Sequence, residues 1–428
     1  MILMDKKILA IAVVLIVAVG GVVACFAILG NGSKSGGDDS VRGVMDVYGN
    51  ADMNGAIDSD DKKYIQDVLD GKADQTKYCD ANHDGKVNAD DLTYIQDLID
   101  YKSGTTAYYI DGNKDVAQAT FPLKTIVSFG VNSGSLYMLA LGFKYPDVIM
   151  YDTHPLAPEN PDVVLKPFEG AKAIRSATPD DYTTITSAGI PDAVVCPNYY
   201  SSYATADQLE VYKKAGIDLI FVNSMDSGGV GDFELTLGFL FNRNAAAQKF
   251  ANWAYELEDA IKDGIKKVDA SKYPDVIAVT GGGQVKGTSS PYTASMKMAG
   301  ANNAVDFTDD RILYTDPTWL LNYSSAGEYI IHMVVVGYGT TPDGISATYN
   351  NYVSKYYTQM DAYKNGKVYV LDNGIPVILR MAYIAELLHP DAFEKGFADS
   401  WHQKLIELYG IDYQASSHQF LYTEAPKS

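Results

Sequence analysis

The sequence contains very few cysteines. Its three cysteines, Cys25, Cys79 and Cys196, are too few for a disulfide framework, and none belongs to a Cys-x-x-Cys pair. Their scarcity argues against a disulfide-stapled domain and against the usual zinc or dithiol redox motifs. We expect Cys79 and Cys196 to be small buried hydrophobic side chains.

Positive charge is also scarce. The chain has 34 Lys and Arg residues against 54 Asp and Glu residues, a formal net charge of −20. A nucleic-acid partner is therefore not expected, because phosphate binding needs a basic face.

Common catalytic motifs are missing as well. The stretch "TGGGQVKGTS" is glycine-rich, but Lys286 precedes Gly287 and Thr288, which breaks the Gly-Lys-Ser/Thr order of a nucleotide loop. We expect a cleft loop or a hairpin there. No Gly-x-Ser-x-Gly elbow occurs, and the six histidines form no HxxxH or HxH pair. His332 ends an apolar stretch, which is typical of a hydrogen-bonded core histidine.

Apolar and aromatic residues, in contrast, are plentiful. Hydrophobic residues make up 47% of the 428 residues, and 32 residues are tyrosine. A chain of this length and composition predicts two or three folded domains. Tyrosine is common on recognition surfaces because it combines a flat apolar ring with a hydroxyl group.

A long apolar run occupies the N-terminus. Residues 8–29 carry no charge and follow "MDKK", so they are long enough to span a hydrocarbon core of about 30 Å, with the N-terminus inside. Residues 1–30 are therefore either an uncleaved transmembrane anchor or a lipoprotein signal that ends near Cys25. Both alternatives place the chain at the outer face of the cell membrane. The Gly/Ser-rich residues 31–40 form a predicted flexible linker.

Two twelve-residue loops repeat one pattern thirty residues apart, "NADMNGAIDSDD" and "DANHDGKVNADD". Both place oxygen-bearing side chains at positions one, three, five, nine and twelve, glycine at six, and a helix-forming stretch afterwards. This spacing suits calcium, which binds six to eight hard oxygen ligands. We predict two structural Ca²⁺ ions, with ligands from Asn50, Asp52, Asn54, Asp58 and Asp61 and from Asp80, Asn82, Asp84, Asn88 and Asp91.

The doubled loop–helix pattern of residues 41–103 resembles a dockerin, a small α-helical calcium-loop domain. The resemblance implies calcium-dependent folding and attachment to a cohesin domain. Asn50 stands where dockerins usually have aspartate, which implies weaker calcium binding by the first loop. The residues before position twelve, Ser59-Asp60 and Ala89-Asp90, differ between the copies, so symmetric binding in two orientations is not expected.

Residues 120–428 show a different pattern, after a predicted linker at 104–119. Short β-branched runs alternate with helical stretches, which indicates an α/β fold with parallel strands. We expect strands at "KTIVSF", "DVIMY", "DAVVC", "DLIFV", "DVIAVT", "YIIHMVVV" and "KVYVL". A gap-free helical pattern over 243–268 separates residues 120–242 from residues 269–428.

Two α/β lobes joined by one long helix resemble the class III periplasmic-binding-protein-like family, the solute-binding proteins of ABC importers for siderophores, haem and cobalamin. Ordered segments carry the resemblance: "KTIVSFGVNSGSLYMLALGF", "NRNAAAQKFANW", "KMAGANNAVDF", "YKNGKVYVLDNG" and "AELLHPDAF". The family implies binding of a metal chelate between the lobes, without catalysis, and docking to an ABC permease. Leu136 occupies the place where the family often has the glutamate that docks the permease, so the docking residues stay open.

Loop residues at the expected strand ends are the candidate ligand contacts. In lobe 1 a helix N-terminus and polar or aromatic side chains point to an anionic or chelated ligand. In lobe 2, tyrosines and one arginine offer stacking and carboxylate pairing. The candidates are Asn132, Ser133, Tyr151, His154, Asn198, Tyr199, Tyr200, Met225, Asp226, Gln284, Tyr292, Tyr338 and Arg380.

The sequence thus predicts a membrane-anchored, extracellular, non-catalytic solute-binding protein with a dockerin. Two alternatives stay open. The chain is a surface assembly protein whose body is a binding module, or it is a dockerin-bearing enzyme that acts on an extracellular polysaccharide.

Overall fold

The computed structural model describes residues 42–154, 161–175, 181–203, 205–223, 229–313, 317–338 and 342–424. Within this part of the chain, no helix has both the length and the apolar character needed to cross a membrane. The predicted anchor or signal at residues 8–29 and the linker 31–40 lie outside the described residues.

The loop–helix region contains two similar helices, α2 (Ser59–Leu69) and α3 (Ala89–Ile99). Each helix is capped by the ninth residue of its loop, Asp58 or Asn88, whose side chain accepts a backbone hydrogen bond from two residues later. The first helical turn of each contains the loop's last aspartate, and Asp61 and Asp91 are fully buried. The repeated sequence pattern therefore folds into a repeated structure.

A β-hairpin follows where the sequence predicted a linker. Strands β1 (Thr106–Ile110) and β2 (Val116–Thr120) pair antiparallel, and Asn113 lies in the turn between them. The hairpin is tied to lobe 1 because Gly112 N donates to Phe221 O (2.8 Å). Residues 104–119 are thus an ordered connection rather than a plain spacer.

Lobe 1 is built on a five-stranded parallel sheet with the order β5-β4-β3-β6-β7. Its strands are β3 (Ile126–Ser128), β4 (Val148–Asp152), β5 (Lys172–Ile174), β6 (Ala193–Pro197) and β7 (Asp218–Val222). The helical elements are η2 (Gly130–Ser135), α4 (Leu136–Ala140), η3 (Val163–Phe168), α5 (Tyr182–Ile185), η4 (Asn198–Tyr203), α6 (Ala206–Ala215) and α7 (Val230–Leu240).

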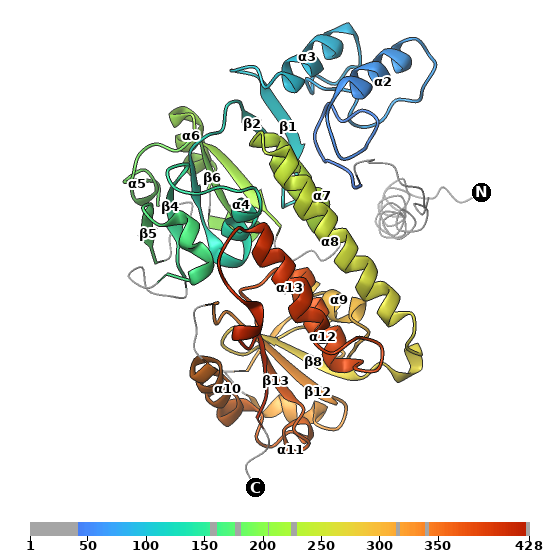
Figure 1. Cartoon of the computed structure of the whole chain (residues 1–428), viewed down its shortest axis with the longest axis vertical. Coiled ribbons are helices and arrows are strands. Elements are labelled where there is room, and N and C mark those ends of the chain that lie inside the picture. Colours follow the sequence, from blue (N-terminus) through green and yellow to red (C-terminus); the bar gives the residue numbers. More distant parts are fainter. Residues whose placement is uncertain are drawn as a thin grey trace, which may run out of the picture. The chain divides into compact units, whose positions relative to one another are not determined.

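One long helix, α8 (Asn244–Ile265), extends from lobe 1 to lobe 2 (Figure 1). Its stripe of Phe250, Trp253, Leu257 and Ile261 is buried, and the helix packs against α7 on one side and α12 and α13 on the other. Trp253 Nε1 donates to the carbonyl oxygen of Trp401 in α13 (3.1 Å). The helix predicted for 243–268 is confirmed.

Lobe 2 contains a mixed sheet with the order β11-β9-β8-β12-β13-β14, and β10 also pairs with β8. Its strands are β8 (Asp275–Thr280), β9 (Gln284–Val285), β10 (Asn302–Asn303), β11 (Arg311–Ile312), β12 (Tyr329–Val334), β13 (Val368–Asp372) and β14 (Leu421–Tyr422). The helices are η5 (Ala270–Lys272), α9 (Pro291–Met298), η6 (Pro317–Tyr323), α10 (Pro342–Tyr356), α11 (Asp361–Lys364), α12 (Val377–Leu388), α13 (Phe397–Leu408) and η7 (Ala415–Ser417).

The loop–helix region is packed onto the body. The rings of Tyr101, Phe121 and Phe239 form a triad with centroids 5.0–5.8 Å apart. Val44 N donates to Asp232 Oδ1 of α7 (2.9 Å). Side chains of the loop–helix region, α8 and both lobes belong to one continuous hydrophobic cluster. Residues 42–103 are therefore part of the same compact unit as the lobes.

Several core residues confirm the sequence analysis. Cys79 and Cys196 are free and buried. His332 is fully buried in β12. Its Nε2 lies 2.7 Å from Gly281 O and its Nδ1 lies 2.7 Å from the Tyr357 hydroxyl. Burial lowers the pKa of His332 to about 4, so the ring is neutral and satisfied, as expected of a core histidine.

Candidate functional site

The two lobes meet through a direct hydrogen bond. The backbone N–H of Tyr338, just after β12 in lobe 2, donates to Asp162 Oδ2 of lobe 1 (2.9 Å). Asp162 is buried, and its other oxygen accepts from Val164 N (3.0 Å). Burial raises the pKa of Asp162 to about 6. The carboxylate thus links the loops on either side of the interlobe junction.

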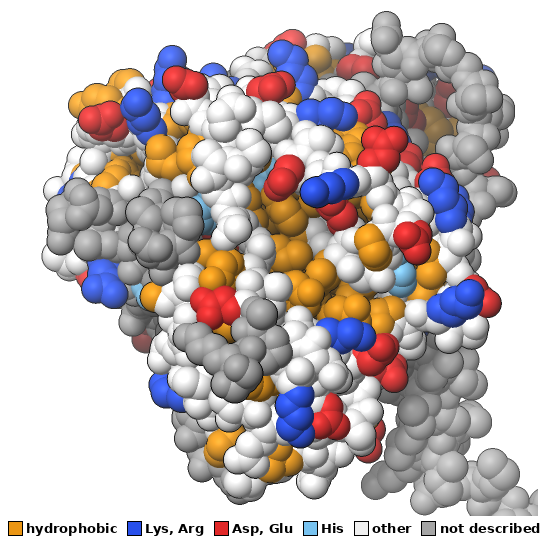
Figure 2. All heavy atoms as spheres, turned by 60° about the horizontal axis from the view of Figure 1, so that its bottom comes forward, with side chains coloured by type: hydrophobic (Ala, Val, Ile, Leu, Met, Phe, Trp, Pro, Cys, Tyr) orange, Lys and Arg blue, Asp and Glu red, His pale blue; other side chains and the backbone are white. Residues whose placement is uncertain are grey.

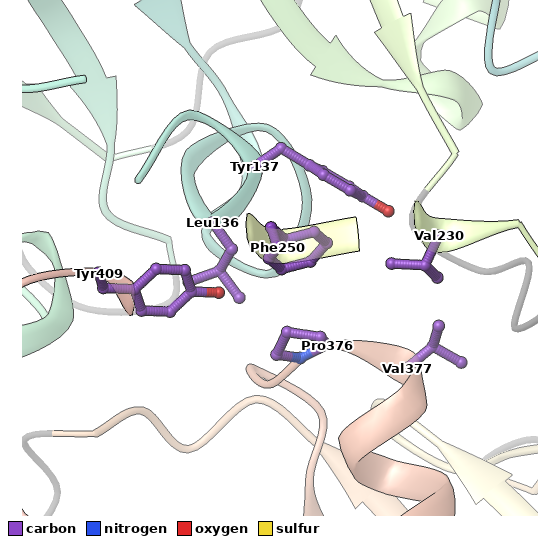
Figure 3. A pocket seen from close by; sticks show the side chains of 7 residues that line it. All are labelled: Leu136, Tyr137, Val230, Phe250, Pro376, Val377 and Tyr409. Carbon is purple, nitrogen blue, oxygen red and sulfur yellow. The ribbon is translucent and has the colours of Figure 1, made fainter. Parts of the chain in front are cut away.

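The deep part of the junction is apolar and nearly filled. It is lined by Leu136, Tyr137, Val230, Phe250, Pro376, Val377 and Tyr409. Figure 3 shows that these side chains converge from lobe 1, from α8 and from lobe 2. The space left between them is about 10 Å³, roughly enough for one water molecule. A larger ligand therefore needs either a more open arrangement or a site closer to the surface.

A larger hollow lies on lobe 2. Its volume is about 300 Å³, and we call it the lobe 2 hollow. It is lined by Lys286, Ser289, Ser290, Pro291, Tyr292, Asp309 and Asp310. Figure 2 views the molecule with the lobe 2 end brought forward and shows side chains of both charge signs around a group of hydrophobic ones. Both polar and aromatic contacts are therefore available to a ligand.

Among the predicted contacts, Tyr292 and Arg380 lie together in lobe 2. The Arg380 guanidinium carbon is 5.4 Å from the centroid of the Tyr292 ring. Asn373 accepts a hydrogen bond from Arg380 and donates from Nδ2 to the Tyr292 hydroxyl (3.1 Å). Arg380 is only 2% exposed, so in this structure it positions Tyr292 and Asn373 rather than facing solvent. Burial lowers the pKa of Arg380.

Gln284 holds the side chain of Lys286 in place. Its Oε1 accepts from Lys286 Nζ (2.7 Å), and the same ammonium pairs with Asp310 (2.8 Å). Lys286 is 6% exposed and lies 5.1 Å from the centroid of the Tyr292 ring. The stretch "TGGGQVKGTS" forms the β8–β9 hairpin expected as one alternative, and it delivers this buried cation to the lobe 2 hollow.

Tyr199 is an exposed predicted contact of lobe 1, with 47% of its surface accessible. It packs edge-on against Tyr200, with ring centroids 4.8 Å apart. Partial burial raises the pKa of Tyr199, and the nearby phenols of Tyr200 and of Tyr292 in lobe 2 add to the shift. Asn198 is engaged elsewhere, since its Nδ2 donates to Gly112 O of the hairpin (2.9 Å).

The remaining candidates of lobe 1 are two buried residues, one exposed histidine, and side chains that lie outside the described residues. Ser133 is fully buried, with its Oγ 3.4 Å from Gly130 O, and Tyr151 is buried against Phe168. His154 is exposed, and its backbone N donates to Asp152 Oδ1 (2.8 Å). The side chain of Asn132, and both Met225 and Asp226, lie outside the described residues.

Tyr338 is not in an open cleft, contrary to the prediction. The side chain is 1% exposed and packs against His402 and Phe420, with its hydroxyl 2.9 Å from His402 Nε2. Tyr338 follows a strand, as predicted, but its ring points into the core rather than into a cleft. Its backbone N–H, rather than its phenol, contributes to the junction.

Sequence reasoning missed Lys286, Ser290 and Asp162. Lys286 was considered only as part of a phosphate loop. For Ser290 the sequence offered one weak indication, a serine directly before a proline in "TSSPY". Asp162 lies in an acidic stretch without any motif. Only tertiary contacts between distant segments identify these three.

The second acidic loop has a regular network of backbone hydrogen bonds. Asp80 accepts from Asp84 N (3.0 Å) and Gly85 N (2.8 Å), Asn82 accepts from Asp84 N (3.0 Å), and Asp84 accepts from Lys86 N (2.9 Å). Asp91 closes the loop by accepting from Asn82 N (3.3 Å) and Asn88 N (2.8 Å). These bonds curl the loop so that alternate side chains bend inwards.

The first loop differs because asparagine amides take part. Asn50 Nδ2 donates to Asn54 O (2.7 Å), and Asn54 Nδ2 donates to Asp52 Oδ2 (2.8 Å). Asp61 accepts from Asp52 N (3.1 Å) and Asp58 N (2.9 Å), and burial raises its pKa. Within the described ranges, no group of three or more His, Cys, Asp or Glu side chains is arranged to hold a metal ion. The oxygen-rich donor set suits calcium chemically, more so in the second loop.

Comparison with solved structures shows the fold of the body. The chain is similar to the TroA-like periplasmic binding protein FepB of Veillonella parvula, with 14% identity and a TM-score of 0.56 over 74% of this chain and 99% of that chain. It is also similar to an ABC transporter solute-binding protein of Sulfurospirillum deleyianum, with 16% identity and a TM-score of 0.53 over 72% and 97% of the two chains.

A third similar structure is the molybdate-binding protein MolA of Haemophilus influenzae, with 14% identity and a TM-score of 0.53 over 72% of this chain and 98% of that chain. No protein-family model and no curated protein matches the sequence. The predicted α/β fold of two lobes is thus confirmed as that of TroA-like periplasmic binding proteins.

Proposed function

We propose that the protein is the substrate-binding component of an ABC importer for a metal chelate of the iron-siderophore, haem or cobalamin type. The main support is the lobe 2 hollow, lined by Tyr292 and Lys286, in a fold that known solute-binding proteins share. The Tyr292 ring offers a stacking face, and Lys286 and Arg380 place positive charge 5.1 and 5.4 Å from its centroid.

The mechanism of such a protein is binding. A helix as long as α8, packed against both lobes, restricts the lobes to small movements, because large rotations would break its buried contacts with α7, α12 and α13. The solved structures of the same fold are described as binding proteins for solutes, which favours this function over a polysaccharide-active enzyme.

A binding screen tests this proposal. The full chain is titrated with ferric siderophores, haem, cobalamin and molybdate while its tyrosine and tryptophan fluorescence is followed. We expect saturable binding of at least one metal chelate. The absence of binding to all of them would overturn the import function.

We further propose that residues 42–103 are a dockerin-type module that binds Ca²⁺ and a cohesin domain. The inward-curled second loop and its near repeat in the first support this, as do the two identically capped helices. In this arrangement the protein is held at the outer membrane face by its N-terminal segment. The surface assembly role then coexists with ligand binding or replaces it.

Calorimetric titration of the full chain with CaCl₂ tests the module. We expect calcium binding that is abolished in the second loop by the double substitution Asp80→Ala, Asp84→Ala. Asp97→Ala, on α3 outside both loops, serves as the control. Equal calcium binding by the wild type and the double variant would contradict the assignment.

A further inference from the structure

The wall of the lobe 2 hollow contains a polar group with an unmet hydrogen bond. Ser290 immediately precedes α9 and is only 6% exposed, and its Oγ has no partner among the described residues. Its neighbour Ser289 lines the same hollow, but its hydroxyl donates to Thr308 O (2.8 Å). A buried hydroxyl without a partner is unfavourable, so a ligand atom that supplies the partner strengthens binding.

The start of α9 adds further donors. Pro291 occupies the first turn and has no N–H, and the next backbone N–H groups of the turn have no intrahelical acceptor. Tyr292, in the same turn, lines the hollow. The positive end of the helix dipole therefore coincides with the free hydroxyl of Ser290, and together they favour a negatively charged group.

A buried cation stands beside this helix start. Lys286 Nζ is held by Gln284 and Asp310, and Asp310 is itself fixed by Gly287 N, which donates to its Oδ1 (3.0 Å). The ammonium is thus held in place before any ligand arrives. This preorganisation reduces the entropy lost on binding.

The lining of the hollow also contains acidic side chains. Asp309 and Asp310 both line it, and only Asp310 is paired with Lys286. A compact, multiply charged anion such as molybdate would meet the Asp309 carboxylate. A group with one carboxylate and an adjacent hydroxyl or amine suits this mixed lining, since the hydroxyl or amine donates to an aspartate while the carboxylate faces Ser290 and the start of α9.

We propose that the lobe 2 hollow binds a hydroxy- or amino-carboxylate group, with the carboxylate accepting from Ser290 Oγ and the first turn of α9. This inference deepens the proposed import function and rests on it for the claim that the group is part of a metal chelate. Lys286 supplies the neighbouring positive charge, and Asp309 accepts from the hydroxyl or amine.

Titration calorimetry of the full chain tests the inference with three probes: free citrate, iron(III) citrate, and a neutral iron(III) trihydroxamate that carries no carboxylate. We expect Ser290→Ala to weaken binding of the citrate probes by about tenfold or more, as expected for one lost bond to a charged group, and to leave trihydroxamate binding unchanged. The matched control Ser295→Ala, on α9 but outside the lining of the hollow, should keep wild-type affinity. Far-UV circular dichroism and a thermal melt check that both variants fold.

The outcomes separate the two proposals. Binding of the trihydroxamate but of neither citrate probe, or equal effects of both serine variants, would overturn the inference and leave the import function standing. Free citrate binding that needs Ser290, with no binding of any chelate, would support the inference and overturn the import function. Binding of none of the probes would overturn the inference.

Discussion

Asp162 of lobe 1 accepts a hydrogen bond from the backbone N–H of Tyr338 in lobe 2, at 2.9 Å and out of contact with solvent. A carboxylate therefore bridges the two lobes of the body. Because its pKa is raised to about 6, the bridge changes its charge in a mildly acidic range.

This bridge predicts a pH-dependent contribution to stability. The folded pKa of Asp162, about 6, exceeds the ordinary value of 3.8, so between these values the folded state binds more protons than the unfolded state. The contribution is present below pH 4 and is lost as the pH rises through 6, and it amounts to about 3 kcal/mol. The free energy of unfolding is measured by urea denaturation at pH 4.5 and pH 7. The wild type should lose the Asp162 contribution at pH 7, and the Asp162→Asn variant should not show that loss.

The matched control is Asp218→Asn. Asp218 has a similarly raised pKa, about 6, but its carboxylate accepts from Thr120 N within the hairpin–lobe 1 contact and does not bridge the lobes. Only Asp162→Asn should also alter ligand affinity. An identical pH dependence in wild type and Asp162→Asn would show that this carboxyl has an ordinary pKa.

Replacing Glu234 of α7 with an apolar residue should stabilise the folded protein. The residue is fully buried, both of its carboxylate oxygens lack a partner among the described residues, and burial raises its pKa well above the ordinary value. Replacing an unpaired buried carboxyl by an apolar side chain of similar size removes the desolvation cost, so Glu234→Met should raise the free energy of unfolding at pH 7 by roughly 1–3 kcal/mol.

Equilibrium urea denaturation measures this change. Glu258→Met on α8 is the control, because Glu258 pairs with Lys262 at 2.6 Å and its loss should bring no such gain. A Glu234→Met protein that is less stable than the wild type would indicate that Glu234 has a buried partner such as a water molecule.

Opposite substitutions at the first position of the two acidic loops should change calcium affinity in opposite directions. Asn50 donates its amide to Asn54 O, whereas Asp80 presents only carboxylate oxygens to its loop. Adding a ligand charge strengthens calcium binding, so Asn50→Asp should tighten the first site and Asp80→Asn should weaken the second, each by roughly tenfold. Calcium titration calorimetry resolves both sites. Weaker calcium binding in Asn50→Asp would refute the loop assignment.

The ring triad of Tyr101, Phe121 and Phe239 predicts that the loop–helix region unfolds together with lobe 1. Phe239 is 1% exposed and contacts both other rings. Phe239→Ala should cost about 3–5 kcal/mol and split the calorimetric transition, because it removes the packing between the two regions. Phe307→Ala in lobe 2, which packs with Trp319 and Tyr323, should destabilise without separating the loop–helix region. Two transitions already present in the wild type would contradict this coupling.

Much of the fold could be predicted because its main elements carry strong local patterns. Each of the seven predicted strands occurs, from β3 at "KTIVSF" to β13 at "KVYVL", since buried parallel strands are continuous β-branched runs. The short strands β5, β9, β10, β11 and β14 escaped prediction, because two or three residues carry no periodicity. The hairpin β1–β2 was taken for a linker because its second strand, VAQAT, is largely exposed and lacks a run of β-branched or aromatic residues.

The site was predictable only in part. The rule that loops after parallel strands gather at one edge of a sheet selected Tyr292, which lines the lobe 2 hollow, and Arg380, whose guanidinium carbon lies 5.4 Å from the Tyr292 ring centroid. Their part in ligand binding stays a prediction. The same rule failed for Tyr338, whose ring enters a pocket formed by His402 and Phe420 of distant segments. Lys286 is held in place by Asp310 and Gln284, and no local sequence pattern predicts such contacts.

Binding of a chelate between the lobes is tested most directly by titrating the full chain and three tyrosine variants with the best ligand of the fluorescence screen. Tyr199→Ala and Tyr292→Ala should each weaken binding by about tenfold or more, since each removes a stacking face worth roughly 1–2 kcal/mol. Tyr145→Ala, an exposed tyrosine that precedes β4 at the other end of the sheet, should keep the wild-type affinity. Failure of every chelate to bind, or equal affinities in all three variants, would contradict a ligand site shared by the two lobes.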